Sequence, residues 1–296
     1  MPAFFTHYAF GIKNYKKMEY GYLKKIIHEH KTVYSLGNIG PDIFLYYFPD
    51  MLFGEKKPGT LLHEKHSRRF FENMLKRAEL FSKKKREIAY AYIAGFVGHY
   101  ELDVHCHPLV YYETENADAR KEMATHFSLE GAMDVFCSYE YLYRLPTELK
   151  QKDMIKLSRE ERKVLCILLA DAYQVTYHKP WQPPVKMWLV LQSVRAVITF
   201  LEDRRGWKES VWTRLEKRLY GHVYCAPLFI NNNTYQYTVE DWYEFHELWR
   251  DGLKEYQSVI VLMDKYVSKK GDKRNCRKEL LMRLGNQSYH AGKVVG

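Results

Sequence analysis

Residues 98–108 read GHYELDVHCHP and carry three histidines, His99, His105 and His107, and one aspartate, Asp103. An α-helix turns by about 100° per residue, so His99, Asp103 and His107, spaced i, i+4, i+8, line one face. On the same helix His105 points about 240° away from His99. A polar stripe of this kind is costly to bury without partners, and a bound metal ion would offset that cost. We interpret the stripe as one side of a metal site.

The segment around this stripe favours a buried helix. Residues 85–105 are largely apolar, with Ile88, Ile93 and Phe96 near helical spacing. Little of such a helix can face water. We expect Pro108 to end it, because the residue before a proline resists the α region.

A second stripe follows in ATHFSLEGAMD, residues 124–134, where His126, Glu130 and Asp134 repeat the i, i+4, i+8 spacing. It lies on a helix expected over 117–142. Imidazole nitrogens and carboxylate oxygens make a natural zinc set without any thiolate. Since a carboxylate can bridge two ions, two such stripes indicate a multinuclear site. We expect Asp134 to orient a histidine rather than to bind metal.

The histidines are concentrated in the first part of the chain. Of the 13 in the sequence, those before residue 127 are His7, His28, His30, His63, His66, His99, His105, His107 and His126. A metal centre built from this part of the chain accounts for the uneven distribution.

Helical periodicity is common along the whole chain and strand-like alternation is scarce. Besides the two helices above, we expect helices over 15–30, 60–81, 158–176, 185–203, 208–220 and 239–268. GNIGPD at 37–42 is typical of a turn, KPWQPP at 179–184 of a rigid connector, and the segment after about residue 285 of a loose tail. The prediction is an all-α fold in one multi-helix domain over 1–296. Its metal-binding core covers about 1–145, and a helical continuation covers about 150–285.

Charge and cysteine content indicate the class of binding partner and the cellular compartment. The net charge is +10 with a pI near 9.1, which favours anionic partners. The basic residues are dispersed, so nucleic acid is a weak expectation; phosphorylated substrates and peripheral contact with an anionic membrane are the other anionic partners that the charge favours. Five cysteines without paired spacing suit reduced thiols. With no signal-like start and no run of eighteen apolar residues, we expect a cytoplasmic protein. The oligomeric state is not indicated.

In these residues the sequence resembles the zinc-dependent phospholipase C family and its related zinc nucleases. The resemblance covers about residues 1–145. It rests on HxxxD at His99 and Asp103 with His107 after it, and on HxxxE at His126 and Glu130. It also rests on Asp42 in GNIGPDIFLYY, His63 in LLHEKH and His7 in THYAFG.

The resemblance implies a ligand set of eight residues for two zinc ions, or three. One ion would be held by Asp42, His63, His99 and Asp103, a second by His107, His126 and Glu130, and a third by His7 with Asp103 bridging. His66, one helical turn from His63, remains an alternative to it. Asp42 has the alternative of capping a helix, and His7 that of a hydrogen-bonded core histidine.

The same resemblance implies a metal-dependent hydrolase. In the family the ions clamp phosphoryl oxygens, and a metal-activated water attacks phosphorus. Asp42 would serve as general base or orient that water. The expected activity is phosphodiester hydrolysis of the phospholipase C type, with a phospholipid headgroup or another phosphodiester as substrate. Two alternatives stay open: a zinc nuclease or nucleotide phosphohydrolase of the same fold, and a non-catalytic helical protein with a structural zinc.

Overall fold

The structure is a computed structural model that describes residues 4–47, 58–115, 118–178, 184–223, 225–230, 242–268, 271–289 and 292–293. Within these ranges the regular structure is helical and no strand forms; an isolated bridge pairs Glu202 with Ile230. The prediction of an all-α fold is confirmed. The prediction of one domain over 1–296 stays a prediction.

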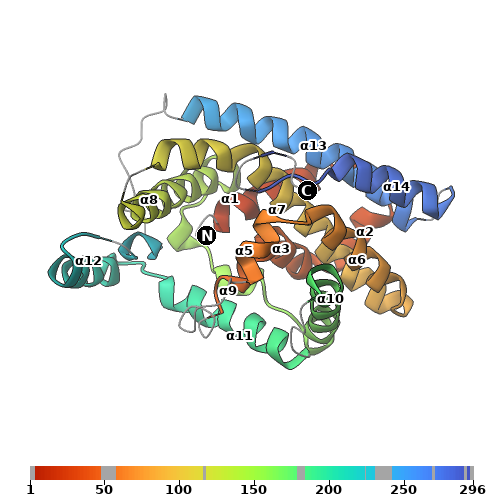
Figure 1. Cartoon of the computed structure of the whole chain (residues 1–296), viewed down its shortest axis with the longest axis horizontal. Helices are drawn as coiled ribbons and strands as arrows, with labels where there is room; N and C mark the ends of the chain where they lie inside the picture. The colour runs from red at the N-terminus through yellow and green to blue at the C-terminus, as the bar shows by residue number, and fades with distance from the viewer. Residues whose placement is uncertain are drawn as a thin grey trace.

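Figure 1 shows how the helices are arranged along the chain. The first half contains α1 Phe4–Lys17, α2 Tyr22–Glu29, α3 Lys31–Ile39, the 3₁₀ turn η1 Gly40–Phe44, α5 Pro58–Glu64, α6 Ser67–Glu79, α7 Lys83–Thr114 and α8 Ala119–Cys137. The second half contains η2 Ser138–Leu142, η3 Pro146–Glu148, α9 Gln151–Met154, α10 Arg159–Tyr177, α11 Pro184–Leu201, α12 Trp207–Tyr220, η4 Ala226–Leu228, α13 Tyr243–Val267 and α14 Lys273–Leu284.

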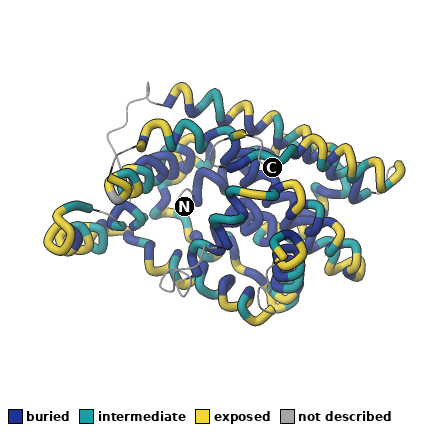
Figure 2. Tube along the Cα trace, viewed as in Figure 1, coloured by how far each residue is buried: buried dark blue, intermediate teal, exposed yellow. Residues whose placement is uncertain are grey.

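Helix α7 is the centre of the fold, and its middle is buried on all sides (Figure 2). It packs against α3, α13, α6, α8, α10 and α1. The closest approach is to α3, where a Cβ on Gly95 would lie 2.2 Å from the carbonyl oxygen of Tyr34. Only glycine lets the two backbones meet at that distance. The contact brings the end of α3 and the start of η1 against the histidine stripe of α7.

Pro108 does not end this helix, so that prediction is wrong: α7 continues through it to Thr114. A proline inside a helix leaves the carbonyl four residues earlier without its helical donor, and here that carbonyl belongs to Val104. Gly292 of the C-terminal segment packs here, since a Cβ on it would lie 2.9 Å from the Val104 oxygen. The Val104 carbonyl, which lacks its helical hydrogen bond, is thus covered by the C-terminal segment of the chain.

Two other expected helices are each divided in two. The segment 15–30 bends after Lys17 and restarts at Tyr22 as α2, whose Leu23 N–H donates to Asp264 Oδ1 at 2.7 Å. The segment 60–81 breaks at His66, which is left-handed at φ 64°. The predicted turn GNIGPD is also wrong in part, because Gly37–Ile39 still belong to α3.

The expected loose tail is wrong for the part that the structure describes. Helix α14, which precedes it, was not predicted. After α14 the Gln287 N–H donates to the hydroxyl oxygen of Tyr100, and the Ser67 hydroxyl donates to the Gln287 carbonyl. Tyr289 is 1% exposed. These contacts are all with distant residues, so no local periodicity announces them.

The other expected helices agree with α8, α10, α11, α12 and α13 to within a few residues. The connector at 179–183 and the start of the helix expected from 239 lie outside the described residues. Among the helices that the structure describes, α11 is long and apolar enough to cross a membrane by length and composition alone. Six of its side chains are nevertheless buried inside the protein.

Candidate metal centre

The stripe on α7 faces the interior as its spacing predicts. His99, Asp103 and His107 lie on one side of the helix, and His99 is fully buried. His105 lies on another side, where its Nδ1–H donates to the Glu101 carbonyl at 2.7 Å beside Gly252 of α13. His105 is therefore separated from the other three side chains.

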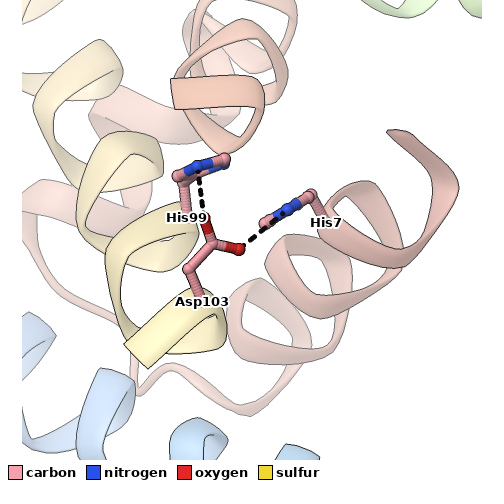
Figure 3. A group of neighbouring side chains, drawn as sticks. All are labelled: His7, His99 and Asp103. Atoms are coloured by element: carbon pink, nitrogen blue, oxygen red, sulfur yellow. Dashed lines mark ion pairs between the residues drawn. The ribbon is translucent and has the colours of Figure 1, made fainter. Parts of the chain in front are cut away.

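Asp103 is the point at which imidazoles from different helices meet. Its Oδ2 lies 2.9 Å from His99 Nε2, and its Oδ1 lies 3.3 Å from Nε2 of His7 on α1 (Figure 3). The His7 and His99 rings stack with centroids 4.1 Å apart. His107 Nδ1 is 3.8 Å from the same Oδ2. With His63, described below, this one carboxylate faces four imidazoles, which suits a bridging ligand.

A second carboxylate enters from η1. Asp42 Oδ1 lies 3.2 Å from Nε2 of His63 on α5, and the same nitrogen is 3.8 Å from Asp103 Oδ2. The close approach of η1 depends on Gly40, whose φ is 53°: a Cβ there would lie 2.4 Å from the His99 ring.

Of the two histidines left open by the sequence, it is His63 that faces the other donors. His66 begins α6 and lies near Tyr177, with ring centroids 6.1 Å apart. His66 belongs to none of the donor groups found among the described residues.

The third part of the centre lies toward solvent. His126 Nε2 on α8 is 3.2 Å from Glu130 Oε1, and His107 Nε2 is 3.4 Å from the same oxygen. The side chains of His107 and His126 are 13% and 12% exposed. The ring of Tyr111 lies beside both imidazoles, with centroids 5.8 and 5.2 Å away. This end of the centre can be reached by a molecule from solution.

Backbone carbonyls orient two of the buried imidazoles. His99 Nδ1 is 3.2 Å from the Asn38 carbonyl, and His63 Nδ1 is 2.7 Å from the Gly59 carbonyl. If each Nδ1 carries the proton and donates it, Nε2 is left as an acceptor that faces the carboxylates. A neutral imidazole held in this way is ready to bind a metal through Nε2.

The charges in the centre keep its carboxylates ionised. Burial alone would raise the pKa of Asp103, but the facing imidazoles of His107, His99 and His7 outweigh it and hold that pKa well below its usual range. His99 and His63 lower the pKa of Asp42 against the same effect of burial. Conversely, Asp103 and Asp42 raise the pKa of His99 although burial would lower it.

The donors fit zinc. Three groups have ligand atoms within 4.8 Å of one another: His7, His99 and Asp103; Asp42, His63 and His99; and His107, His126 and Glu130. Three buried atoms, His7 Nδ1, His99 Nε2 and Asp103 Oδ2, have no partner in hydrogen-bond geometry within the described part of the chain. Leaving such buried polar atoms without a partner destabilises the folded protein unless a ligand binds them. The structure brings all eight predicted ligands together; their coordination of zinc stays a prediction.

Asp134 has a different role from the expected one. Its Oδ1 accepts hydrogen bonds from the Thr6 N–H at 2.8 Å and the Thr6 hydroxyl at 2.9 Å. It therefore fixes the first turn of α1, directly before His7, instead of contacting an imidazole. Burial raises the pKa of Asp134 to about 8.

Tyr289 is a site residue that the sequence did not reveal. Its ring lies 5.0 Å from the His63 ring and 5.9 Å from the His99 ring. Its backbone N–H donates to the His63 carbonyl at 3.0 Å. The tyrosine closes the buried end of the centre from outside the first 145 residues.

Comparison with known proteins agrees with this geometry. The model of a family described as zinc dependent phospholipase C matches residues 1–179, which include every donor in the centre. No curated protein and no solved structure matches the chain.

Proposed function

The chain belongs to the zinc-dependent phospholipase C family, and we propose that it hydrolyses phosphodiesters, with the headgroup ester of a phospholipid as substrate. The family makes it a metal-dependent hydrolase. The observation that carries the proposal is the row of donors along α7, because three donor groups share its side chains and one end of the row reaches solvent.

The resident ions would be zinc, held by Asp42, His63, His99, Asp103 and His7 at the buried end and by His107, His126 and Glu130 at the solvent end. When bound, zinc offsets the negative charge of phosphoryl oxygens and makes water a stronger nucleophile near neutral pH. The number of ions is not part of the proposal.

Asp42 is proposed to accept the proton of the attacking water or to orient that water. The low pKa of Asp42 keeps it ionised at neutral pH, as a base requires. Its Oδ1 is held beside His63, so it is positioned by an imidazole that is itself hydrogen-bonded to the backbone.

Solvent access favours a catalytic over a structural zinc site. A structural site is closed around its ion, whereas a catalytic site keeps an open position. Here His107 and His126 are partly exposed and adjoin Tyr111, while His99 is fully buried. A phosphodiester could therefore approach from the Glu130 side.

The test is hydrolysis by purified, zinc-loaded protein of three substrates: a short-chain phosphatidylcholine, single-stranded DNA and a chromogenic phosphodiester. We expect headgroup release from the phospholipid, loss of that activity with a chelator and recovery with zinc. His126→Ala should lose it, and His105→Ala, the matched control on the wrong face of α7, should keep it.

Cleavage of DNA without phospholipid hydrolysis would replace the proposed substrate by a nucleic acid. Zinc-loaded protein that hydrolyses none of the three would overturn the catalytic proposal and leave the zinc in a structural role.

A further inference from the structure

Helix α11 turns an uncharged face to the outside. Its inner side chains pack on α10, α9 and η1. Its outer positions include Val185 and Phe200, which are 65% and 53% exposed, and Trp188, which is 44% exposed. The outermost residues of α13, by contrast, include Arg250, Asp251 and Lys254. An exposed apolar stripe of this length on one helix is uncommon in a monomeric protein.

Helix α12 continues this surface. Trp207, Val211, Leu215 and Leu219 repeat every four residues, so they share a side, and they are 44–62% exposed. The end of α11 meets α12 through Phe200, whose ring lies 6.3 Å from that of Trp212. We call Trp188, Phe200, Trp207, Val211, Leu215 and Leu219 the α11–α12 face.

The charges beside this face are basic. Between residues 204 and 221 the exposed charged residues are Arg204, Arg205, Arg214, Lys217 and Arg218, whereas Lys208 and Glu209 are partly buried. Two nearby acids are buried in internal contacts. Asp203 accepts from the Glu209 N–H, and Glu216 accepts from Trp212 Nε1 and the Cys225 N–H. These acids hold α12 and do not neutralise its surface.

We propose that the α11–α12 face docks the protein on the surface of an anionic phospholipid bilayer. An exposed apolar stripe with tryptophans and flanking basic residues suits the interface, where rings and aliphatic chains enter the headgroup region and cations meet lipid phosphates. The face lies beyond residue 179, outside the segment matched by the family model.

The α11–α12 face is connected to the metal centre through η1 and η4, so docking would help to present substrate. This part of the inference rests on the proposed function. Helix α11 contacts η1, which carries Asp42. Helix α12 contacts η4, and η4 contacts α8, which carries His126 and Glu130 (Figure 1). Docking would bring lipid headgroups to the side of the molecule from which these elements extend.

The packing of α11 also indicates how it meets the membrane. Met187, Val190 and Val194 are buried against the rest of the protein, so lipid cannot surround the helix. The α11–α12 face would therefore lie on the bilayer and not cross it.

The experiment is co-sedimentation of the full zinc-loaded protein with vesicles of phosphatidylcholine alone or mixed with phosphatidylserine. We expect strong binding to the mixed vesicles, weakened by salt. Leu215→Glu with Leu219→Glu should reduce it at least about tenfold, because two apolar anchors are lost and two repulsive charges gained. Val261→Glu on α13, 54% exposed in the native protein, is the matched control and should bind normally. Arg214→Glu with Arg218→Glu should reduce binding about fivefold for each basic charge removed.

Unchanged vesicle binding by the Leu215 and Leu219 variant would overturn the inference. It would also be overturned if the native protein self-associates and the variant loses this self-association while its vesicle binding stays the same. A protein that stays in solution only with detergent would overturn the surface-lying geometry. Hydrolysis of a water-soluble phosphodiester should be normal in every variant. Vesicle binding without any hydrolysis would defeat the proposed function and leave docking intact.

Discussion

The two ends of the donor row on α7 use the same side-chain chemistry in opposite surroundings. At the buried end, His7, His99 and Asp103 are enclosed by α1, α3 and the segment around Tyr289. At the solvent end, His107 and His126 share Glu130 and remain partly exposed. The difference teaches that similar side chains can be placed for different tasks. On the proposed function, the buried end would bind metal tightly and the open end would admit substrate.

The largest effect on stability should come from the buried end. His99→Ala removes a fully buried imidazole that faces Asp103 and Asp42, leaving carboxylates without compensation, at about 3–5 kcal/mol of unfolding free energy. Denaturant unfolding and elemental mass spectrometry would show lower stability and lost zinc. His105→Ala should keep its full zinc content. Equal zinc loss in the two variants would contradict the assignment of His99 to the metal-facing side of α7 and of His105 to another side.

Tyr289→Ala should loosen the buried end without touching a ligand. Removing a buried aromatic ring costs about 3 kcal/mol, and loss of support behind His63 should weaken zinc binding about 10–100-fold. Competition with a fluorescent zinc chelator measures this. Tyr289→Phe keeps the ring and is the matched control. Unaltered zinc affinity in Tyr289→Ala would show that the ring only fills space.

Asp134→Asn should change how stability depends on pH. The folded-state pKa of about 8 lies above the unfolded value near 4, so the folded chain holds this proton more tightly. The contribution of Asp134 to stability is therefore greatest below about pH 4 and is lost as the pH rises from there through 8. Asparagine can still accept from Thr6 but carries no charge, so the variant should be more stable at pH 8, on the order of 3 kcal/mol, and unchanged near pH 4.

Thermal unfolding of the chelated protein across this pH range tests the expectation for Asp134. Parallel curves for the variant and the native protein would contradict a buried carboxyl with a raised pKa.

His126→Ala should have the smallest effect on stability and still abolish activity. The side chain is partly exposed, so its loss should cost less than about 1 kcal/mol of unfolding free energy. Hydrolysis should fall at least about 100-fold, because the ion nearest solvent loses a ligand. A stability loss matching that of His99→Ala would mean that the two ends do not differ.

The donors themselves could be found from sequence because helical spacing is a local rule. His99, Asp103 and His107 need only one helix to share a face, and His126 with Glu130 need another. The family resemblance then supplied His7, Asp42 and His63, which lie on separate elements and follow no common period.

The features missed by sequence depend on contacts between distant segments. Pro108 stays helical although local sterics oppose it, and Gly292 packs where the helical bond is lost. The burial of Tyr289 and the pairing of Asp134 with Thr6 likewise come from tertiary packing. The breaks at His66 and before Tyr22 were missed because no proline marks either of them.

The hydrogen bond from Tyr289 to His63 bears on the order of events during synthesis. A ribosome makes the chain from its N-terminus, so all eight predicted ligands emerge long before Tyr289 does. Until then the pocket behind His63 lacks its aromatic wall, and joining segments so far apart is intrinsically slow. We expect zinc to enter while that wall is missing and to be retained once it closes. Zinc would then be captured before Tyr289 packs behind His63. Once Tyr289 has packed there, it would slow the release of zinc.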